Sequence, residues 1–250
     1  MRVAAVQHDI CWEDRDATLA RVTPMVATAV DQGAGLVVLP EMFAVGFSMA
    51  PERVSEPPDG PTATWVAEQA SHHGVWVCGT IPEQGERRPR NVLVLAGPDG
   101  TVHRYAKIHP FTYSGEHEHY DAGTELVTVD IEGLRVSLFV CYDLRFGDEF
   151  WGLGPDTDLY VVPANWPAAR GHHWRSLLVA RAIENQAYVV GCNRVGTGGK
   201  LTYDGDSCII DPLGEVLVTA SREEAIVAAD VDPAVVRATR ERFPFLDDRR

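Results

Sequence analysis

The chain has 250 residues and a formal net charge of −14, with 45% hydrophobic and 23% charged residues. These values exclude an intrinsically disordered or collagen-like protein, and no stretch approaches the ~20 apolar residues of a membrane-spanning helix. Because so acidic a surface repels phosphate backbones, we expect no nucleic-acid partner and no membrane partner. We expect a single domain over residues 1–250, since no linker-like composition divides the chain.

In chain order, the first half predicts short apolar strands that alternate with amphipathic helices. The predicted strands cover residues 3–7, 36–39, 75–80, 91–96 and 102–107, and the predicted helices cover 14–29 and 61–73. Pro24 lies inside the first helix, where it predicts a kink or a later start. Pro61 suits the first turn of the second helix.

The second half predicts strands over 126–131, 134–141, 159–164, 187–192, 207–211, 216–219 and 225–231, with helices over 172–186 and 233–242. Turn residues at 97–100, 132–133 and 212–214 predict hairpins. Roughly ten or more strands are too many for one simple twisted sheet. We therefore predict an α/β fold of two packed mixed sheets with helices outside.

The cysteines do not form a disulfide framework. Their number is odd, no two are spaced as C-x-x-C, and they lie in separate apolar segments, at Cys11, Cys78, Cys141, Cys192 and Cys208. Residues 1–8 lack the long apolar region of a signal peptide. Both features favour a reducing, cytoplasmic location.

Three reactive side chains each follow an apolar strand, namely Glu41, Lys107 and Cys141. In α/β sheets the carboxyl ends of strands form the edge where ligands bind. A carboxylate can accept a thiol proton, and an ammonium can stabilise the oxyanion formed when the thiol attacks a carbonyl. Taken singly, each residue has an ordinary alternative, a core cysteine or a solvated Glu or Lys at the rim.

Longer segments around these residues resemble a known family. In order and spacing, they are similar to the three signature segments of the nitrilase superfamily of carbon–nitrogen hydrolases: Leu39-Pro-Glu41-Met-Phe, Tyr105-Ala-Lys107-Ile-His109 and Phe139-Val-Cys141-Tyr-Asp143-Leu-Arg145-Phe. The resemblance covers about residues 2–245 and includes segments 3–7 and 180–188. It implies a four-layer αββα sandwich and a Glu–Lys–Cys triad that cleaves a C–N bond without a metal or other cofactor.

The resemblance also implies roles for these residues. Glu41 matches the general base, Lys107 the oxyanion stabiliser and Cys141 the nucleophile. The backbone N–H of Tyr142 would be the second oxyanion donor. The family usually forms homodimers through a helical face, and we expect the same here.

The loop over residues 114–123 admits three interpretations. Its histidines and carboxylates, His117, His119, Glu116 and Glu118, resemble metal ligands in type, but no further Cys or His pair lies at a matching spacing. It can also be an exposed polar loop. The family carries a fourth catalytic-site glutamate in this loop, which orients the lysine and the substrate, and that residue matches Glu116.

Within the superfamily, the chain resembles the omega-amidase branch, which removes the terminal amide of α-keto acids such as 2-oxoglutaramate. Segments 115–120, 164–167 and 191–196 carry this resemblance. The predicted partner is therefore a small-molecule amide. Alternatives are a carbamoyl-amide hydrolase, another aliphatic amidase or a nitrilase, and outside these a metal-dependent hydrolase or a catalytically silent scaffold.

The carboxylate of such a substrate favours a bidentate arginine. Arg145 is nearest to the nucleophile in sequence, although it could instead pair with Asp143 or Glu149. Trp166 could form a wall of the pocket or belong to the core. The weaker candidates for substrate contact are His109, Trp166 and Arg194.

Overall fold

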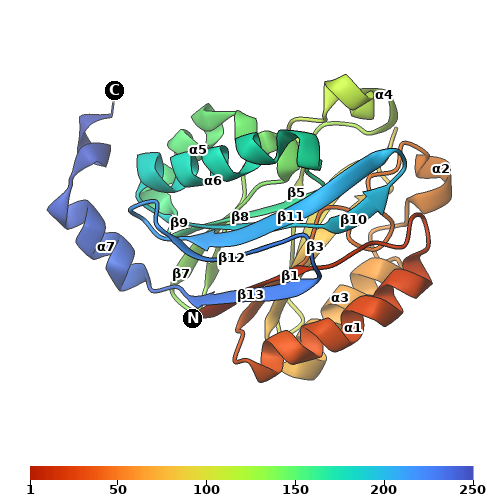
Figure 1. Cartoon of the computed structure of the whole chain (residues 1–250), viewed down its shortest axis with the longest axis horizontal. Coiled ribbons are helices and arrows are strands. Elements are labelled where there is room, and N and C mark those ends of the chain that lie inside the picture. The colour runs from red at the N-terminus through yellow and green to blue at the C-terminus, as the bar shows by residue number, and fades with distance from the viewer. Residues whose placement is uncertain (250) are drawn as a thin grey trace.

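Two mixed β-sheets form the centre of the molecule in the computed structural model, which describes residues 1–249 (Figure 1). The first sheet contains, in spatial order, β13 (Ala225–Asp230), β1 (Arg2–Gln7), β2 (Leu36–Val38), β3 (Trp76–Glu83), β4 (Arg90–Ala96) and β5 (Val102–Ala106). Strands β1, β2 and β3 are parallel, and β4 and β13 are antiparallel to their neighbours. The carboxyl ends of β2, β3 and β5 therefore lie at one edge.

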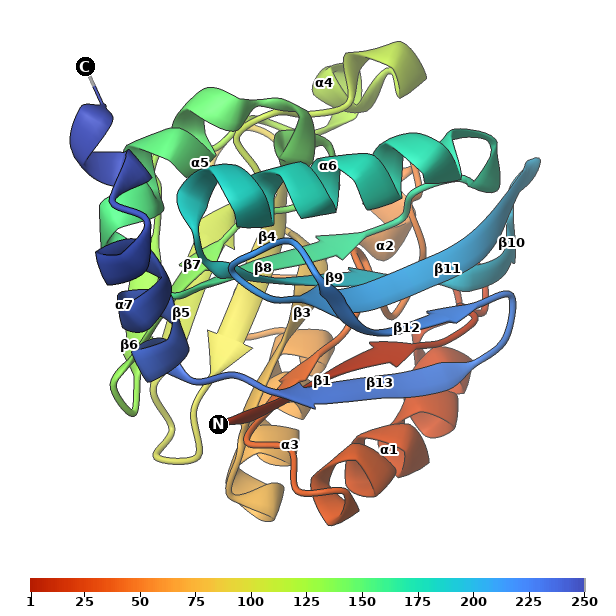
Figure 2. The same cartoon turned by 60° about the vertical axis from the view of Figure 1, so that its left-hand side comes forward.

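The second sheet has the same kind of parallel centre. Its spatial order is β10 (Val195–Gly198), β11 (Leu201–Ile210), β9 (Tyr188–Asn193), β8 (Leu159–Ala164), β7 (Leu134–Leu138) and β6 (Thr128–Ile131), with β12 (Val216–Ser221) also paired to β11. Strands β7, β8 and β9 are parallel. The long strand β11, together with the short strand β10 paired to it, extends beyond the other strands toward the beginning of the helix α6 (Gly171–Asn185) (Figure 2).

Helices cover the outer face of each sheet. Helices α1 (Arg15–Asp31) and α3 (Pro61–His73) pack on the first sheet, and α5 (Gly147–Leu153) and α6 pack on the second (Figure 1). This arrangement confirms the predicted four-layer αββα sandwich. The remaining helices are short or terminal: α2 (Pro51–Val54), α4 (Glu116–His119) and α7 (Pro233–Arg242).

The period of two along the strands creates two separate cores. In β1, Val3 and Ala5 join the core that fills the space between the sheets, whereas Ala4 and Val6 join the core under α1 and α3. All four side chains are buried. A strand that is covered on both faces needs apolar residues throughout, which explains why β1 and β2 have unbroken apolar runs.

The predicted elements are largely present, with informative differences. Helix α1 begins at Arg15, so the predicted later start at Pro24 is wrong. The Asp14 side chain caps this helix by accepting a hydrogen bond from the Ala17 N–H at 3.0 Å, and the buried Val22 anchors it on the sheet. These contacts keep Pro24 inside the helix.

Two differences concern the site. Strand β7 ends at Leu138, three residues before Cys141, instead of reaching the cysteine. The β10–β11 hairpin was not predicted, because Gly196, Gly198 and Gly199 in this segment read as a loop. Within residues 1–249, none of the helices has the length and apolar content needed to cross a membrane.

Candidate active site

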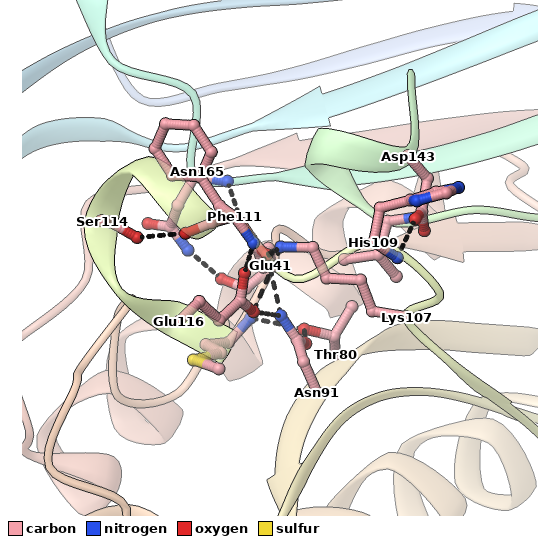
Figure 3. A network of polar contacts seen from close by, with 12 residues as sticks. Glu41, Thr80, Asn91, Lys107, His109, Phe111, Ser114, Glu116, Asp143 and Asn165 are labelled. Atoms are coloured by element: carbon pink, nitrogen blue, oxygen red, sulfur yellow. Dashed lines mark hydrogen bonds and ion pairs between the residues drawn. The ribbon is translucent and has the colours of Figure 1, made fainter. Parts of the chain in front are cut away.

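The carboxylate of Glu41 lies three residues after β2 and is completely buried. Its Oε1 accepts hydrogen bonds from Lys107 Nζ and Asn91 Nδ2, both at 2.8 Å (Figure 3). Its Oε2 accepts one from the Asn165 N–H at 2.8 Å. Donors from both sheets therefore fix this carboxylate in one orientation.

Lys107 follows β5 directly and lies between two carboxylates. Its Nζ is 2.8 Å from Glu41 Oε1 and 2.8 Å from Glu116 Oε2. Burial disfavours the charged amine, but the negative charges of Glu116 and Glu41 outweigh this effect and raise the pKa of Lys107 well above its usual value. Lys107 is therefore an ammonium at neutral pH.

Glu116 begins α4 and is the member of its loop that reaches Lys107 (Figure 3). Glu116 is buried, whereas His117 and Glu118 are exposed. Burial raises the pKa of the Glu116 carboxyl, Lys107 opposes this rise, and the charge of Glu41 adds to it. Among residues 1–249, no three histidine, cysteine or carboxylate side chains are grouped as metal ligands would be.

Cys141 begins the 3₁₀ helix Cys141–Arg145 in a sharp backbone turn. Its φ angle is 47°, in the left-handed region that non-glycine residues rarely adopt. Burial raises the pKa of its thiol well above the usual value, the charge of Glu41 raises it further, and Lys107 acts in the opposite direction. The resting thiol is therefore protonated, and the Glu41 carboxylate, whose charge acts on the thiol, is the group placed to take its proton.

Cys141 opens into a pocket. The lining is largely aromatic and apolar, with Phe47, Phe111, Tyr142, Trp166, Pro167, Leu201 and Tyr203. Two arginines, Arg145 and Arg170, also line it, and within residues 1–249 neither forms an ion pair with a carboxylate. An apolar pocket with a few polar groups is the usual form of a small-molecule site.

The two arginines are held by contacts that leave their charge uncompensated. Arg145 lies over the Trp166 ring at 4.8 Å and its Nη2 is 3.1 Å from His173 Nδ1. Arg170 lies over the Phe111 ring at 5.3 Å. These cation–π contacts orient the guanidinium groups without neutralising them.

The carboxylates that could have paired with Arg145 have other partners. Asp143 accepts hydrogen bonds from Tyr105 and from backbone N–H groups, and Glu149 contacts His109. Arg145 therefore pairs with neither Asp143 nor Glu149 in the structure.

Two residues that the sequence offers as substrate contacts, His109 and Arg194, are not among the residues that line this pocket. The His109 ring lies 2.7 Å from Glu149 Oε1 and stacks on Phe146, so it is absent from the pocket lining. Arg194 is completely buried and pairs with Asp9 at 2.6 Å. Arg194 instead supports the pocket indirectly, because its guanidinium lies 4.6 Å from the ring of Tyr203.

Tyr142 and Trp166 do line the pocket. Trp166 is nearly buried, packs on Trp174 and donates its indole N–H to the Arg170 carbonyl at 2.8 Å. It therefore belongs to both the core and the pocket wall. The Tyr142 ring lies 4.8 Å from that of Phe111.

A family model described as carbon-nitrogen hydrolase matches residues 2–241 of the chain. The chain belongs to the carbon-nitrogen hydrolase family. This assignment confirms the predicted nitrilase superfamily and the predicted class of enzyme, a hydrolase of C–N bonds.

Relatives of known name cover nearly the whole chain. The omega-amidase YafV of Escherichia coli (strain K12) is 40% identical over 99% of this chain and 96% of its own length. A 2-oxoglutaramate amidase of Bacillus subtilis is 36% identical over 99% of this chain and 97% of its own length. The solved structure of XC1258 from Xanthomonas campestris, a CN-hydrolase superfamily protein with an arsenic adduct in the active site, has a TM-score of 0.95 at 37% identity. It covers 100% of this chain and 97% of that one.

Sequence reasoning missed several residues of this hydrolase site. Asn91 donates to Glu41 at 2.8 Å and to Glu116 at 3.2 Å, and its Oδ1 accepts a hydrogen bond from Thr80 at 2.7 Å (Figure 3). The available signal was that Asn91 and Thr80 are polar residues within apolar strands. Arg170 lies in a short segment with no strand or motif to single it out.

Proposed function

We propose that this chain is an amidase of the omega-amidase type. Its substrate is a small carboxylate-bearing amide such as 2-oxoglutaramate, and its products are the acid and ammonia. One observation carries the proposal: the Cys141 thiol opens into an apolar pocket whose two arginines have no carboxylate partner within residues 1–249. The names of two relatives, omega-amidase and 2-oxoglutaramate amidase, support the same substrate class.

The first half-reaction forms a thioester. Cys141 Sγ attacks the amide carbon as its proton moves to Glu41, and the carbonyl oxygen becomes an oxyanion. Lys107 Nζ and the Tyr142 N–H stabilise that oxyanion; the Tyr142 N–H lies in the first turn of a 3₁₀ helix, where N–H groups lack intrahelical acceptors. Glu41 then gives the proton to the departing nitrogen, the C–N bond breaks, and ammonia leaves.

The second half-reaction restores the thiol. A water molecule loses a proton to Glu41 and attacks the thioester carbon. The C–S bond breaks, the acid leaves, and the proton on Glu41 returns to Cys141. In this scheme Glu116 keeps Lys107 charged and in place through the contact at 2.8 Å.

Asn165 gives a reason why the substrate is an amide. Its Nδ2 donates to the Glu41 carbonyl, so its Oδ1 has no hydrogen-bond partner within residues 1–249 although it is buried beside the pocket. A buried acceptor without a partner is costly. The NH₂ group of a bound amide would satisfy it, whereas an acid or ester oxygen without hydrogen would not.

The arginines give a reason why the substrate is an anion. Arg145 and Arg170 both line the pocket; the Arg145 guanidinium lies over the Trp166 ring, and the Arg170 guanidinium lies over the Phe111 ring. A guanidinium binds a carboxylate through paired, charge-assisted hydrogen bonds. We assign the substrate carboxylate to Arg145, with Arg170 adding positive charge at the same end of the pocket.

We further propose a homodimer in a reducing, cytoplasmic environment. The outer side of α6 exposes Ile183 next to Gly214, and the adjoining Leu213 is also exposed, which supports a helical face as the contact surface. The five cysteines are all free thiols.

The test is ammonia release from five compounds: 2-oxoglutaramate, 2-oxosuccinamate, an aliphatic amide, a carbamoyl amino acid and a nitrile. We expect release from the two keto-acid amides, and a loss of at least ~10³-fold in kcat for Cys141→Ala with an unchanged fold by circular dichroism. Cys11→Ala, which removes a half-buried thiol outside the pocket, is the matched control.

The other compounds distinguish the competing activities. Carbon dioxide released together with ammonia would identify a carbamoyl-amide hydrolase, and ammonia from the nitrile would identify a nitrilase. Activity confined to either compound would overturn the substrate class. Activity that survives in Cys141→Ala would overturn the mechanism.

A further inference from the structure

Asp143 is a buried carboxylate two residues after the nucleophile, and it is not part of the proposed acyl transfer. Its Oδ2 accepts hydrogen bonds from Tyr105 Oη at 2.8 Å and from the Val140 N–H at 3.0 Å. Its Oδ1 accepts one from the His109 N–H at 2.8 Å (Figure 3). The Asp143 side chain thus links the Tyr105 hydroxyl to the backbone N–H groups of His109 and Val140.

The positions of these three points are specific. Tyr105 lies two residues before Lys107, inside β5 of the first sheet, and His109 lies two residues after Lys107, on the segment that leaves β5. Val140 directly precedes Cys141, on the segment that leaves β7 of the second sheet. Asp143 therefore connects the backbone on both sides of the lysine to the backbone turn that carries the thiol.

The Cys141 turn needs such support. Its φ of 47° is an unfavourable conformation for a residue with a side chain, and it persists only where surrounding contacts fix it. The bond from the Val140 N–H to Asp143 fixes the residue just before the turn. A backbone turn that is fixed in this way can keep the Cys141 sulfur at a set position relative to Lys107 Nζ.

We propose that Asp143 is a positioning residue that fixes Lys107 and Cys141 relative to each other across the two sheets. This inference rests on the roles proposed above for those two residues. Its consequence is that weakening the Asp143 bonds lowers the rate of acyl transfer rather than the affinity for substrate, because neither Asp143 nor Tyr105 lines the pocket.

The charge of Asp143 is retained in an unfavourable environment. Burial raises its pKa to about 6, while the Lys107 ammonium and the hydrogen bonds from His109 and Tyr105 act in the opposite direction. A further carboxylate, Glu149, contacts the His109 ring through Oε1. At neutral pH Asp143 is therefore mainly a carboxylate and accepts all three bonds.

The experiment compares Tyr105→Phe and Asp143→Asn with the wild type. Tyr105→Phe deletes one hydroxyl and keeps the ring, so we expect about a tenfold lower kcat with KM changed less than about twofold. Asp143→Asn replaces acceptor capacity with a donor that faces N–H groups, and we expect about a hundredfold lower kcat. The rate of Cys141 alkylation by iodoacetamide, with Cys11 as internal reference, should fall in the same order.

Tyr160→Phe is the matched control, since Tyr160 Oη is also buried and donates to a carbonyl, that of Phe150, at 2.8 Å without contacting the site. We expect it to lower the melting temperature as much as Tyr105→Phe but to leave kcat and alkylation unchanged. Equal kcat in Tyr105→Phe and Tyr160→Phe, with Asp143→Asn also at wild-type kcat, would overturn the proposal.

The two proposals can fail separately. If the wild type is inactive on keto-acid amides, the substrate class fails, and the kcat comparison moves to whichever C–N substrate is turned over. The alkylation rates remain readable in either case. If both the alkylation rate and kcat are unchanged in Asp143→Asn, the positioning role of Asp143 is refuted, whereas the proposed amidase function is not.

Discussion

At the scale of residues, the buried charges decide how the thiol is activated. Glu41 and Glu116 carry two negative charges around the single positive charge of Lys107, so the cluster is negative by one. A thiolate beside it would add a second uncompensated charge to a dry site. The thiol proton is therefore best transferred to Glu41 in the same step as the attack.

Thr80 is the residue that orients the amide between the two carboxylates. Its hydroxyl donates to Asn91 Oδ1 at 2.7 Å and accepts from the Met42 N–H at 2.7 Å, next to Glu41. With Oδ1 fixed by Thr80, the Asn91 NH₂ must face Glu41 and Glu116. The Thr80 hydroxyl thus influences Glu41 in two ways: through the Asn91 side chain that it orients, and through the backbone N–H of the adjacent Met42.

Thr80→Val keeps the shape but leaves the Met42 N–H and Asn91 Oδ1 without partners. We expect a loss of about 1–3 kcal/mol in the free energy of unfolding and about a tenfold lower kcat. Urea denaturation and ammonia release measure these two quantities. Thr157→Val is the control, because the buried Thr157 hydroxyl bonds Ser137 and Leu153 away from the site. A kcat equal in both variants would contradict the prediction.

The sequence was sufficient to nominate residues near the carboxyl ends of strands, but not the partners that hold them. Glu41, Lys107 and Cys141 stood out by position and by family resemblance. Asn91 and Thr80 did not, because a polar residue in a strand can face either side, and only the pairing of β3 with β4 decides which. His109 was a candidate for substrate contact because it is close to Lys107 in sequence, but this closeness does not determine where its ring points.

At the scale of elements, the β10–β11 hairpin forms one wall of the pocket through Leu201 and Tyr203. Arg194, just before β10, anchors it. Its Nη2 pairs with Asp9 at 2.6 Å and donates to the Thr197 carbonyl at 2.9 Å. The hairpin is therefore attached to the loop after β1 as well as to its own sheet.

The Arg194→Met variant should distinguish the contribution of this pocket wall from that of the catalytic residues. It leaves the half-buried Asp9 without its partner, and we expect about 3 kcal/mol lower stability. We expect KM to rise about tenfold or more while kcat changes less than about threefold, because the hairpin contacts the substrate and not Lys107 or Glu41. Steady-state kinetics and urea denaturation test this.

Arg175→Met provides the comparison, since Arg175 pairs with Asp206 but is half-exposed. Exposed ion pairs contribute about 0–1 kcal/mol, so this variant should resemble the wild type. A kcat effect larger than the KM effect in Arg194→Met would show that the hairpin acts on the chemistry instead.

Helices and strands with clear periodicity were predictable, and elements defined by tertiary contacts were not. Helices α3 and α7 and strand β8 have the predicted bounds. Strand β10 lies in a glycine-rich segment, where it pairs with β11 and accepts a hydrogen bond from Arg194 at the Thr197 carbonyl. The early end of β7 follows from the Cys141 turn, which no local pattern indicates.

At the scale of the whole molecule, His8 ties stability to pH. It is fully buried, and burial lowers its pKa from 6.5 to about 4, although its bond to the Asp9 carbonyl acts in the opposite direction. Between these values the unfolded chain binds a proton that the folded protein does not. Stability therefore falls as pH decreases from 6.5 to 4, by about 3 kcal/mol in total.

His8→Asn should remove this dependence. The stability of the wild type minus that of the variant should be about 3 kcal/mol lower at pH 4 than at pH 7. Urea midpoints across this range measure it, and His72→Asn, an exposed histidine of α3, is the control. Asp143, whose raised pKa stabilises the protein as pH falls below about 6, is present in both proteins and cancels. Parallel curves would refute the assignment to His8.

The division of the site between two sheets has a consequence for synthesis. Glu41 and Lys107 follow strands of the first sheet and Cys141 follows a strand of the second, so a growing chain that has made only β1 to β5 contains the base and the cation without the nucleophile. After Cys141 emerges, its sulfur remains an ordinary protonated thiol until the sheets dock. Newly made chains therefore acquire the ability to form an acyl-enzyme only at the last stage of folding.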